Sequence, residues 1–163
     1  MEPVTVAGFI ERAMTWESAA RDYYLTFSSA FRSDSAVAEI WQQMADDESR
    51  HLSILTRTRD SLSDHRLAAP LDSRGVALVE SVEAEFRRIR TAEVRTLDDA
   101  YEIAHGLESS EVNAVFELLV TLQAEDAGAT ALLEAQFGEH VGRLALLARR
   151  YDREARRRIA PEA

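Results

Sequence analysis

The sequence MADDESRHLSIL, residues 44–55, places Glu48 and His51 three positions apart inside an apolar helical stripe. Residues at this spacing share one face of a helix, so the carboxylate and the imidazole point toward whatever the stripe packs against. A buried carboxylate without a partner is strongly destabilising. The rest of the chain is therefore expected to supply that partner.

The composition indicates a helical protein of one domain. The chain has 163 residues, of which 46% are hydrophobic and 29% charged, as is ordinary for a globular protein that buries its own core. Six Gly and three Pro are few, which is typical of proteins built mainly of helices. We expect a single all-α domain that spans residues 1–163.

Charge and cysteine content narrow the classes of function. The formal net charge of −10 argues against nucleic-acid binding and is compatible with attracting cations. The chain contains no Cys, which excludes disulfides, thiolate metal sites and a cysteine nucleophile within it. Any metal chemistry must therefore use Asp, Glu and His.

The first residues, MEPVTVAGFIERAM, do not resemble a signal peptide, because they lack a basic start and a long apolar run. No run of about 18 apolar residues, the length that spans a membrane, occurs in the sequence. A cytoplasmic protein without a membrane partner is the expectation.

The apolar periodicity predicts a first helix hairpin over residues 5–62. Its first helix runs from about Thr5 to about Phe31 and carries Glu17 in the middle of its apolar stripe. Asp34 or Ser35 is the expected N-cap of the second helix, which ends near residue 62. The connection is short, so the two helices should be antiparallel neighbours. The stripe of the second helix comprises Val37, Trp41, Met44, Glu48, His51 and Leu55.

Residues 63–95 read as a long crossover that contains an additional, outer helix ending near Val94. The apolar side of this outer helix comprises Val79, Val82, Phe86 and Ile89. A second hairpin is predicted over residues 96–152. Its first helix opens at Thr96 and has Glu108 and Glu111 at stripe positions, and its second helix begins near residue 130 and has His140.

The two predicted hairpins resemble each other in sequence. The segment WESAARDYYLTF superimposes on LESSEVNAVFEL, which pairs Glu17 with Glu108. The segment MADDESRHLSIL superimposes on LEAQFGEHVGRL, which pairs His51 with His140. Two such hairpins joined by a long crossover form an antiparallel four-helix bundle.

Six polar residues occupy stripe positions that would otherwise be apolar. Four carboxylates close together would repel one another or take up protons, whereas two divalent ions about 3.5–4 Å apart would neutralise them and accept the imidazoles as ligands. Oxygen-rich ligation with added nitrogen suits iron best, with manganese or zinc as alternatives. The predicted metal ligands are Glu17, Glu48, His51, Glu108, Glu111 and His140.

These residues resemble the ferritin-like di-iron carboxylate family, and most closely its rubrerythrin branch. The similarity is carried by Glu17, the E-x-x-H pair Glu48 and His51, and Glu108 with Glu111. It covers about 100 residues in the four predicted helices. In that family each half of the bundle supplies a bridging Glu and an E-x-x-H pair, and rubrerythrins carry one further Glu to which Glu111 is similar. Tyr24 falls where the family often has a tyrosine that touches a ligand carboxylate.

The chain departs from the family pattern at the second E-x-x-H, where Phe137 stands in place of the Glu. Glu111 would restore the number of ligands, although the site would then be less symmetric. An alignment without a gap instead places Glu139 opposite Glu48, but Glu139 lies off the apolar stripe of its helix. His65 and His105 are expected at the surface, and Trp16 and Trp41 in the core.

The resemblance implies a non-haem di-metal protein that oxidises Fe(II) with peroxide or dioxygen. The Cys-rich rubredoxin module of rubrerythrins is not found in this sequence, so turnover would need an external electron donor. A homodimer is also implied. The alternative is a metal-binding or storage protein with a degenerate second half-site and no redox turnover, and a third possibility is a helical bundle without metal.

Overall fold

A computed structural model describes residues 4–122 and 145–146, with the side chains of α5 described as far as Ser109. It contains five named helices: α1 (Val6–Ala30), α2 (Ser35–Ser61), α3 (Asp64–Leu67), α4 (Ser73–Ile89) and α5 (Leu97–Leu122). Within these described ranges β-type pairing is limited to one isolated antiparallel bridge between Thr5 and Pro70. The all-α fold class predicted from the sequence is confirmed.

Side-chain caps explain where the helices begin. The Thr5 hydroxyl accepts a hydrogen bond from the backbone of Gly8 at 3.2 Å. Asp34 accepts from the backbone amides of Ala36 and Val37 at 3.1 and 3.2 Å, so Asp34 is the N-cap of α2. Such caps satisfy backbone donors that have no partner within the helix. The predicted bounds of α1 and α2 agree with the structure to within one residue at each end.

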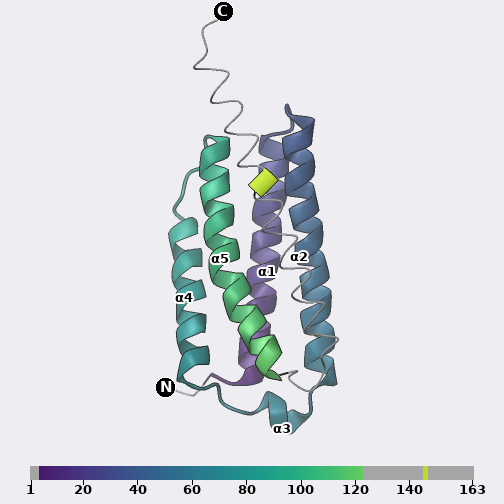
Figure 1. Cartoon of the computed structure of the whole chain (residues 1–163), viewed down its shortest axis with the longest axis vertical. Coiled ribbons are helices and arrows are strands. Elements are labelled where there is room, and N and C mark those ends of the chain that lie inside the picture. The colour runs from purple at the N-terminus through teal and green to yellow at the C-terminus, as the bar shows by residue number, and fades with distance from the viewer. Residues whose placement is uncertain (1–3, 123–144, 147–163) are drawn as a thin grey trace, which may run out of the picture.

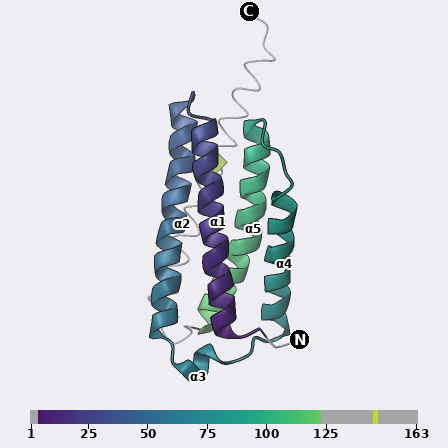
Figure 2. The same ribbon diagram turned by 180° about the vertical axis from the view of Figure 1, so that it is seen from behind.

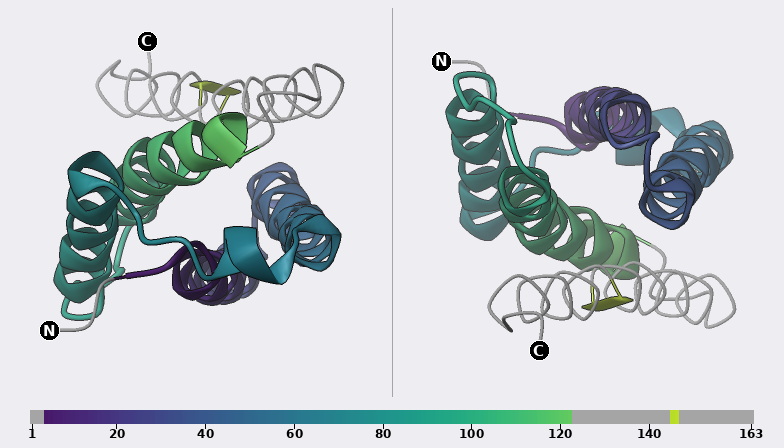
Figure 3. Two further views of the ribbon diagram at one scale, coloured as in Figure 1. Left: turned by 90° about the horizontal axis from the view of Figure 1, so that it is seen from below. Right: turned by 90° about the horizontal axis from the view of Figure 1, so that it is seen from above.

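The helices form antiparallel neighbours, as Figures 1 and 2 show. α1 and α2 pack along their length, α4 packs beside α5, and α1 also contacts α5. The end-on views of Figure 3 show α1 between α2 on one side and the α4–α5 pair on the other. The short α3 joins the end of α2 to the segment that leads into α4.

The buried apolar residues fall into two clusters. The aromatic cluster contains Tyr24, Phe27 and Trp41 and is built from α1, α2, α5 and the end of α4; its other buried members are Ala20, Val37, Met44, Ala45, Ile89, Ala100, Ile103, Ala104 and Leu107. The crossover cluster combines α1 with α4 and Leu55 of α2; its buried members are Val6, Phe9, Ile10, Ala13, Trp16, Leu55, Val79 and Val82. Both tryptophans are therefore core residues, as predicted.

The crossover differs from the expectation in two respects. The break after α2 contains the additional one-turn helix α3, whose cap Ser63 accepts a hydrogen bond from the backbone of Arg66. α4 ends at Ile89 and not near Val94. Its predicted apolar side is nevertheless buried, with Val82 fully enclosed, so α4 contributes to the core and does more than cover the bundle.

The predicted last helix, from about residue 130 to 152, lies outside the described residues apart from residues 145–146, which are helical. The second hairpin is therefore described only by its first helix, α5. α5 begins one residue after the predicted Thr96. The Thr96 hydroxyl accepts a hydrogen bond from the backbone of Asp99 at 3.1 Å, and Asp99 accepts hydrogen bonds from the backbone of Arg95 and Thr96 at 2.9 and 2.8 Å.

Candidate metal centre

A layer of buried polar side chains lies between the two apolar clusters. Along α1, Glu17 comes between Ala13 and Trp16 of the crossover cluster and Ala20 of the aromatic cluster. Along α2, Glu48 comes between Ala45 of the aromatic cluster and Leu55 of the crossover cluster. The helical stripes that bury both clusters therefore carry these carboxylates into the interior as well.

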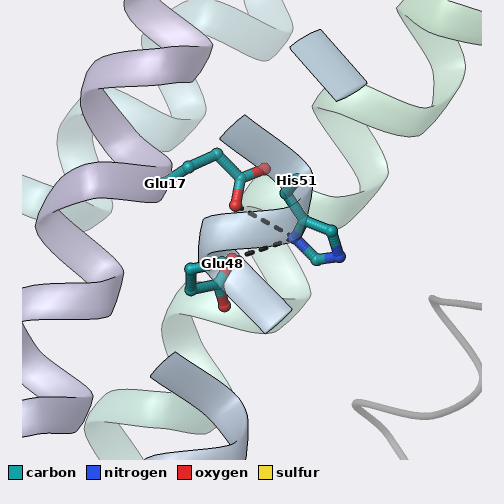
Figure 4. A group of neighbouring side chains, drawn as sticks. All are labelled: Glu17, Glu48 and His51. Carbon is teal, nitrogen blue, oxygen red and sulfur yellow. Dashed lines mark hydrogen bonds and ion pairs between the residues drawn. The ribbon is translucent and has the colours of Figure 1, made fainter. Parts of the chain in front are cut away.

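Three of the predicted ligands meet in this layer. One oxygen of Glu17, one oxygen of Glu48 and one ring nitrogen of His51 lie within 4.8 Å of one another. Figure 4 shows the two carboxylates, from α1 and α2, directed toward the same edge of the His51 ring. Glu17 and Glu48 are only 4% and 3% exposed, whereas the side chain of His51 is 17% exposed. The cluster is thus closed on the carboxylate side and slightly open at the imidazole.

His51 bonds to both carboxylates through one atom. Its Nδ1 lies 2.9 Å from Oε2 of Glu48 and 3.1 Å from Oε2 of Glu17. Both neighbours are carboxylate oxygens, so we assign the Nδ1–H as the donor. A single imidazole proton thus lies among three atoms that could all bind a divalent cation.

The electrostatics of the layer act on His51 in opposing directions. Burial by itself lowers the pKa of His51, but the hydrogen bond to Glu17 and the negative charges of Glu17 and Glu108 raise it, and the net pKa lies above its usual value of 6.5. The positive charge of Arg50 opposes this rise. The surroundings of His51 therefore favour positive charge at this position, which a bound cation would also supply.

Glu108 enters the same layer from α5 but is held differently. Its carboxylate is 7% exposed, and its Oε1 accepts a hydrogen bond of 2.7 Å from the hydroxyl of Tyr24 on α1. It is not part of the three-donor cluster, although its charge reaches His51. The tyrosine–carboxylate contact expected from the family resemblance is therefore present in the structure.

The donor set fits a metal ion. Two carboxylate oxygens and one imidazole nitrogen are ligands that iron, manganese and zinc accept, and their separations suit one ion placed among them. Three carboxylates, of Glu17, Glu48 and Glu108, are buried in one layer, which is costly unless cations or protons offset their charge. A divalent ion would replace the shared proton and remove much of this repulsion.

Two predicted ligands are not tested by the described side chains. Glu111 follows Glu108 by one turn of α5, where the backbone alone is described. His140 lies outside the described residues, as do Phe137 and Glu139. Both His65 and His105 are exposed, in agreement with their predicted surface positions.

One buried carboxylate was missed by the sequence reasoning. Asp47 is 4% exposed and forms an ion pair with Arg50, three residues farther along α2. It precedes Glu48 but lies off the predicted stripe, so the periodicity gave no reason to choose it. The i,i+3 spacing to an arginine was the available signal, since such pairs share one side of a helix.

Comparison with known families agrees with this geometry. The rubrerythrin family model matches residues 8–122. The chain belongs to the rubrerythrin family. The match covers the whole crossover, including α3 and α4, to which the resemblance of the four predicted helices did not extend. It supports the description of the fold as a ferritin-like bundle. Members of the rubrerythrin family typically bind two metal ions, which agrees with the Glu17–Glu48–His51 cluster of this member.

Neither the curated proteins nor the solved structures that were compared gave a match to this rubrerythrin-family chain. Among the helices described, none combines the length and the apolar character needed to cross a membrane.

Proposed function

We propose that this rubrerythrin-family protein holds a non-haem di-metal centre that oxidises Fe(II) with peroxide or dioxygen. One observation carries the proposal: Glu17, Glu48 and His51 converge in a buried layer of the bundle, with the buried Glu108 close enough for its charge to act on His51. This arrangement of carboxylates and imidazole is suited to iron.

The proposal assigns a role to each predicted ligand. Glu48 and His51 would bind one ion, and Glu17 and Glu108 would bridge or flank the two metal ions. Glu111 and His140 would complete the coordination of the second ion. Glu111 would there replace the Glu of the second E-x-x-H, where this sequence has Phe137. For the first ion this assignment is supported by the separations of the donor atoms in the structure; for Glu111 and His140 it rests on their positions in the sequence and on the family resemblance.

The reaction balances with two Fe(II) as the reductant. Each Fe(II) gives one electron, the O–O bond of hydrogen peroxide breaks, and two protons are taken up to form two waters. The side chains orient the ions and limit the access of water, which the burial of Glu17 and Glu48 supports. This sequence has no Cys, so returning the iron to Fe(II) would need an electron donor outside the sequence.

An anaerobic titration followed by a peroxide pulse tests the proposal. The purified protein is loaded with Fe(II), and its ultraviolet–visible spectrum is recorded before and after peroxide is added. We expect about two equivalents of Fe(II) to bind and peroxide to oxidise them within the mixing experiment. Less than one bound equivalent would contradict the proposal.

The matched controls are two carboxylate variants on the same helix. Glu48→Ala should lose most of the binding, because it removes a ligand from the cluster. Glu39→Ala changes an exposed carboxylate of α2 and should bind as the parent does. Equal binding by the Glu48→Ala variant and the parent would contradict the assignment of the site.

The second candidate is a metal-binding or storage protein without redox turnover. Phe137 favours it, because the second E-x-x-H lacks its carboxylate. A bound ion whose spectrum does not change when peroxide is added would support this candidate over the first. If chelators leave the melting temperature unchanged, both candidates are contradicted, since a bound ion stabilises the folded state by mass action.

We include a homodimer in the proposal on the strength of the family resemblance. Light scattering of the purified protein would test it, and a monomer mass would contradict this part alone.

A further inference from the structure

We infer that metal binds in two stages, and that the first ion binds to the α1–α2 hairpin alone, through Glu17, Glu48 and His51 and without Glu108. This inference rests on the proposed function, because it assumes that the polar layer binds metal. It goes beyond that function by assigning an order of binding to the two sides of the layer.

The three donors of the first stage are already assembled in the structure. They come from two helices that are joined by residues 31–34 and packed along their length. Asp34 caps the start of α2 and the turn is closed by the backbone bond from Asp34 to Phe31 at 3.0 Å. Because the donor atoms lie within 4.8 Å of one another, little rearrangement is needed to bind one ion.

The charge of the hairpin also matches a single divalent ion. Glu17 and Glu48 contribute two negative charges when ionised, and a neutral His51 contributes none. One divalent cation therefore neutralises this side of the layer without the carboxylate of Glu108. Water can complete the coordination of this ion from the side of His51, which is the most exposed of the three donor residues.

Glu108 is not one of the three donors, and one of its oxygens accepts a hydrogen bond from the Tyr24 hydroxyl. The hydrogen bond occupies Oε1, and Tyr24 itself is fully buried and stacked on Trp41, with ring centroids 5.9 Å apart and an interplanar angle of 18°. Phe27 packs edge-on against the same indole at 5.1 Å. The aromatic cluster thus positions Tyr24, and Tyr24 positions Glu108 outside the three-donor group.

The second stage would then be the step that uses α5. Glu108 is buried in the same layer and is not among the three donors of the first ion, so its carboxylate is a ligand for a second cation. Tyr24 acts as a positioning residue in this scheme, because it touches Glu108 and is not itself among the three donors.

Cobalt(II) titration of the full chain tests this order. Anaerobic binding is followed by calorimetry and by the visible absorption of Co(II) for the parent, Glu48→Gln, Glu108→Gln, Tyr24→Phe and the exposed control Glu39→Gln. We expect Glu48→Gln to weaken the first ion about 100-fold or more, and Glu108→Gln and Tyr24→Phe to change it by less than about threefold. Circular dichroism of each metal-free variant checks that it folds.

The outcomes separate the order of binding from the function. If Glu108→Gln and Tyr24→Phe both weaken the first ion as much as Glu48→Gln does, the layer binds metal as one unit and the two-stage inference is overturned, while the proposed metal centre stands. If the parent takes up no Co(II) and no Fe(II), both are overturned. Retention of the first ion by Glu108→Gln and by Tyr24→Phe supports the inference.

Discussion

The two sides of the polar layer present the same kind of side chain in different states. On the α1–α2 side, Glu17 and Glu48 converge on one nitrogen of His51. On the α5 side, Glu108 is equally buried but is bonded to the hydroxyl of Tyr24. Burial alone therefore does not decide whether a carboxylate joins the three-donor cluster. The α1–α2 hairpin differs because its two helices are joined by a short connection and pack along their length, which brings three donors to one point.

The apolar clusters on either side of the layer differ in a related way. The aromatic cluster stacks Tyr24 on Trp41 and so fixes the residue that holds Glu108. The crossover cluster contains Val79 and Val82 of α4, and it closes the other end of the bundle. The aromatic cluster thus contacts the polar layer directly, through the hydrogen bond of Tyr24 to Glu108. The crossover cluster instead packs α1 and α2 against α4 on the other side of the layer.

Removing a donor from the α1–α2 hairpin should have the largest effect, and it should act on the affinity for the first metal ion. We expect Glu48→Ala to weaken the binding of the first metal ion at least about 1,000-fold, or about 4 kcal/mol, because one of three assembled ligands is lost. Calorimetric titration with Fe(II) or Co(II) measures this. An affinity within tenfold of the parent would show that the three donors do not act together.

The aromatic cluster should also contribute strongly to stability. Trp41 is fully buried, and Trp41→Ala is expected to lower the free energy of unfolding of the metal-free protein by about 3–5 kcal/mol. Urea unfolding measures the change. Leu25→Ala is the matched control, since Leu25 is 41% exposed and should cost less than about 1 kcal/mol. Similar losses in the two variants would contradict the assignment of Trp41 to the core.

Removing the hydrogen bond between Tyr24 and Glu108 should have a smaller effect on the free energy of unfolding than Trp41→Ala. Tyr24→Phe removes a buried hydrogen bond to a carboxylate and should lower the free energy of unfolding by about 1.5–3 kcal/mol at neutral pH. A double-mutant cycle with Glu108→Ala, which removes the acceptor, isolates the contact between the two residues. Additive effects in that cycle would mean that the hydrogen bond does not stabilise the fold.

The cap of α5 should have the smallest effect, and it depends on pH. Hydrogen bonds from the backbone of Arg95 and from Thr96 lower the pKa of Asp99 below its ordinary value of 3.8. Because the folded-state pKa is depressed, the stabilisation is present above that value and is lost as the pH falls through the folded-state pKa.

Asp99→Ala should therefore lower the melting temperature slightly at pH 6, and the difference should shrink as the pH falls through the folded-state pKa of Asp99, because the parent then loses the charge of its cap. The melting temperatures of the two proteins, measured from pH 6 down to pH 3, check the sign. A difference that grows as the pH falls would contradict it. Metal binding on the α1–α2 side should be unaffected, since Asp99 lies in the first turn of α5 and is not one of the three donors.

Much of the fold and part of the site followed from periodicity. Glu17, Glu48 and His51 were chosen because they interrupt apolar stripes, and the helical geometry then requires them to face the interior, where they are found together. Asp47 interrupts no stripe, and its burial depends on what packs against that side of α2, which spacing along one helix does not reveal. α4 ends earlier than predicted because apolar residues continue past Ile89 to Val94 in the sequence, although the backbone has already turned there.

The distinction between the hairpin donors and Glu108 depends on a contact between α1 and α5. Its two residues, Tyr24 and Glu108, are 84 positions apart in the chain, so only the three-dimensional arrangement could supply it.

Whether the hairpin donors bind iron can be seen in a crystal structure of the protein grown anaerobically with Fe(II), with diffraction recorded on both sides of the iron absorption edge. We expect an anomalous peak among Glu17, Glu48 and Nδ1 of His51, at the distances of about 2.0–2.2 Å that first-row metals make with carboxylate and imidazole ligands. The absence of a peak there, or iron bound only at surface carboxylates, would contradict it.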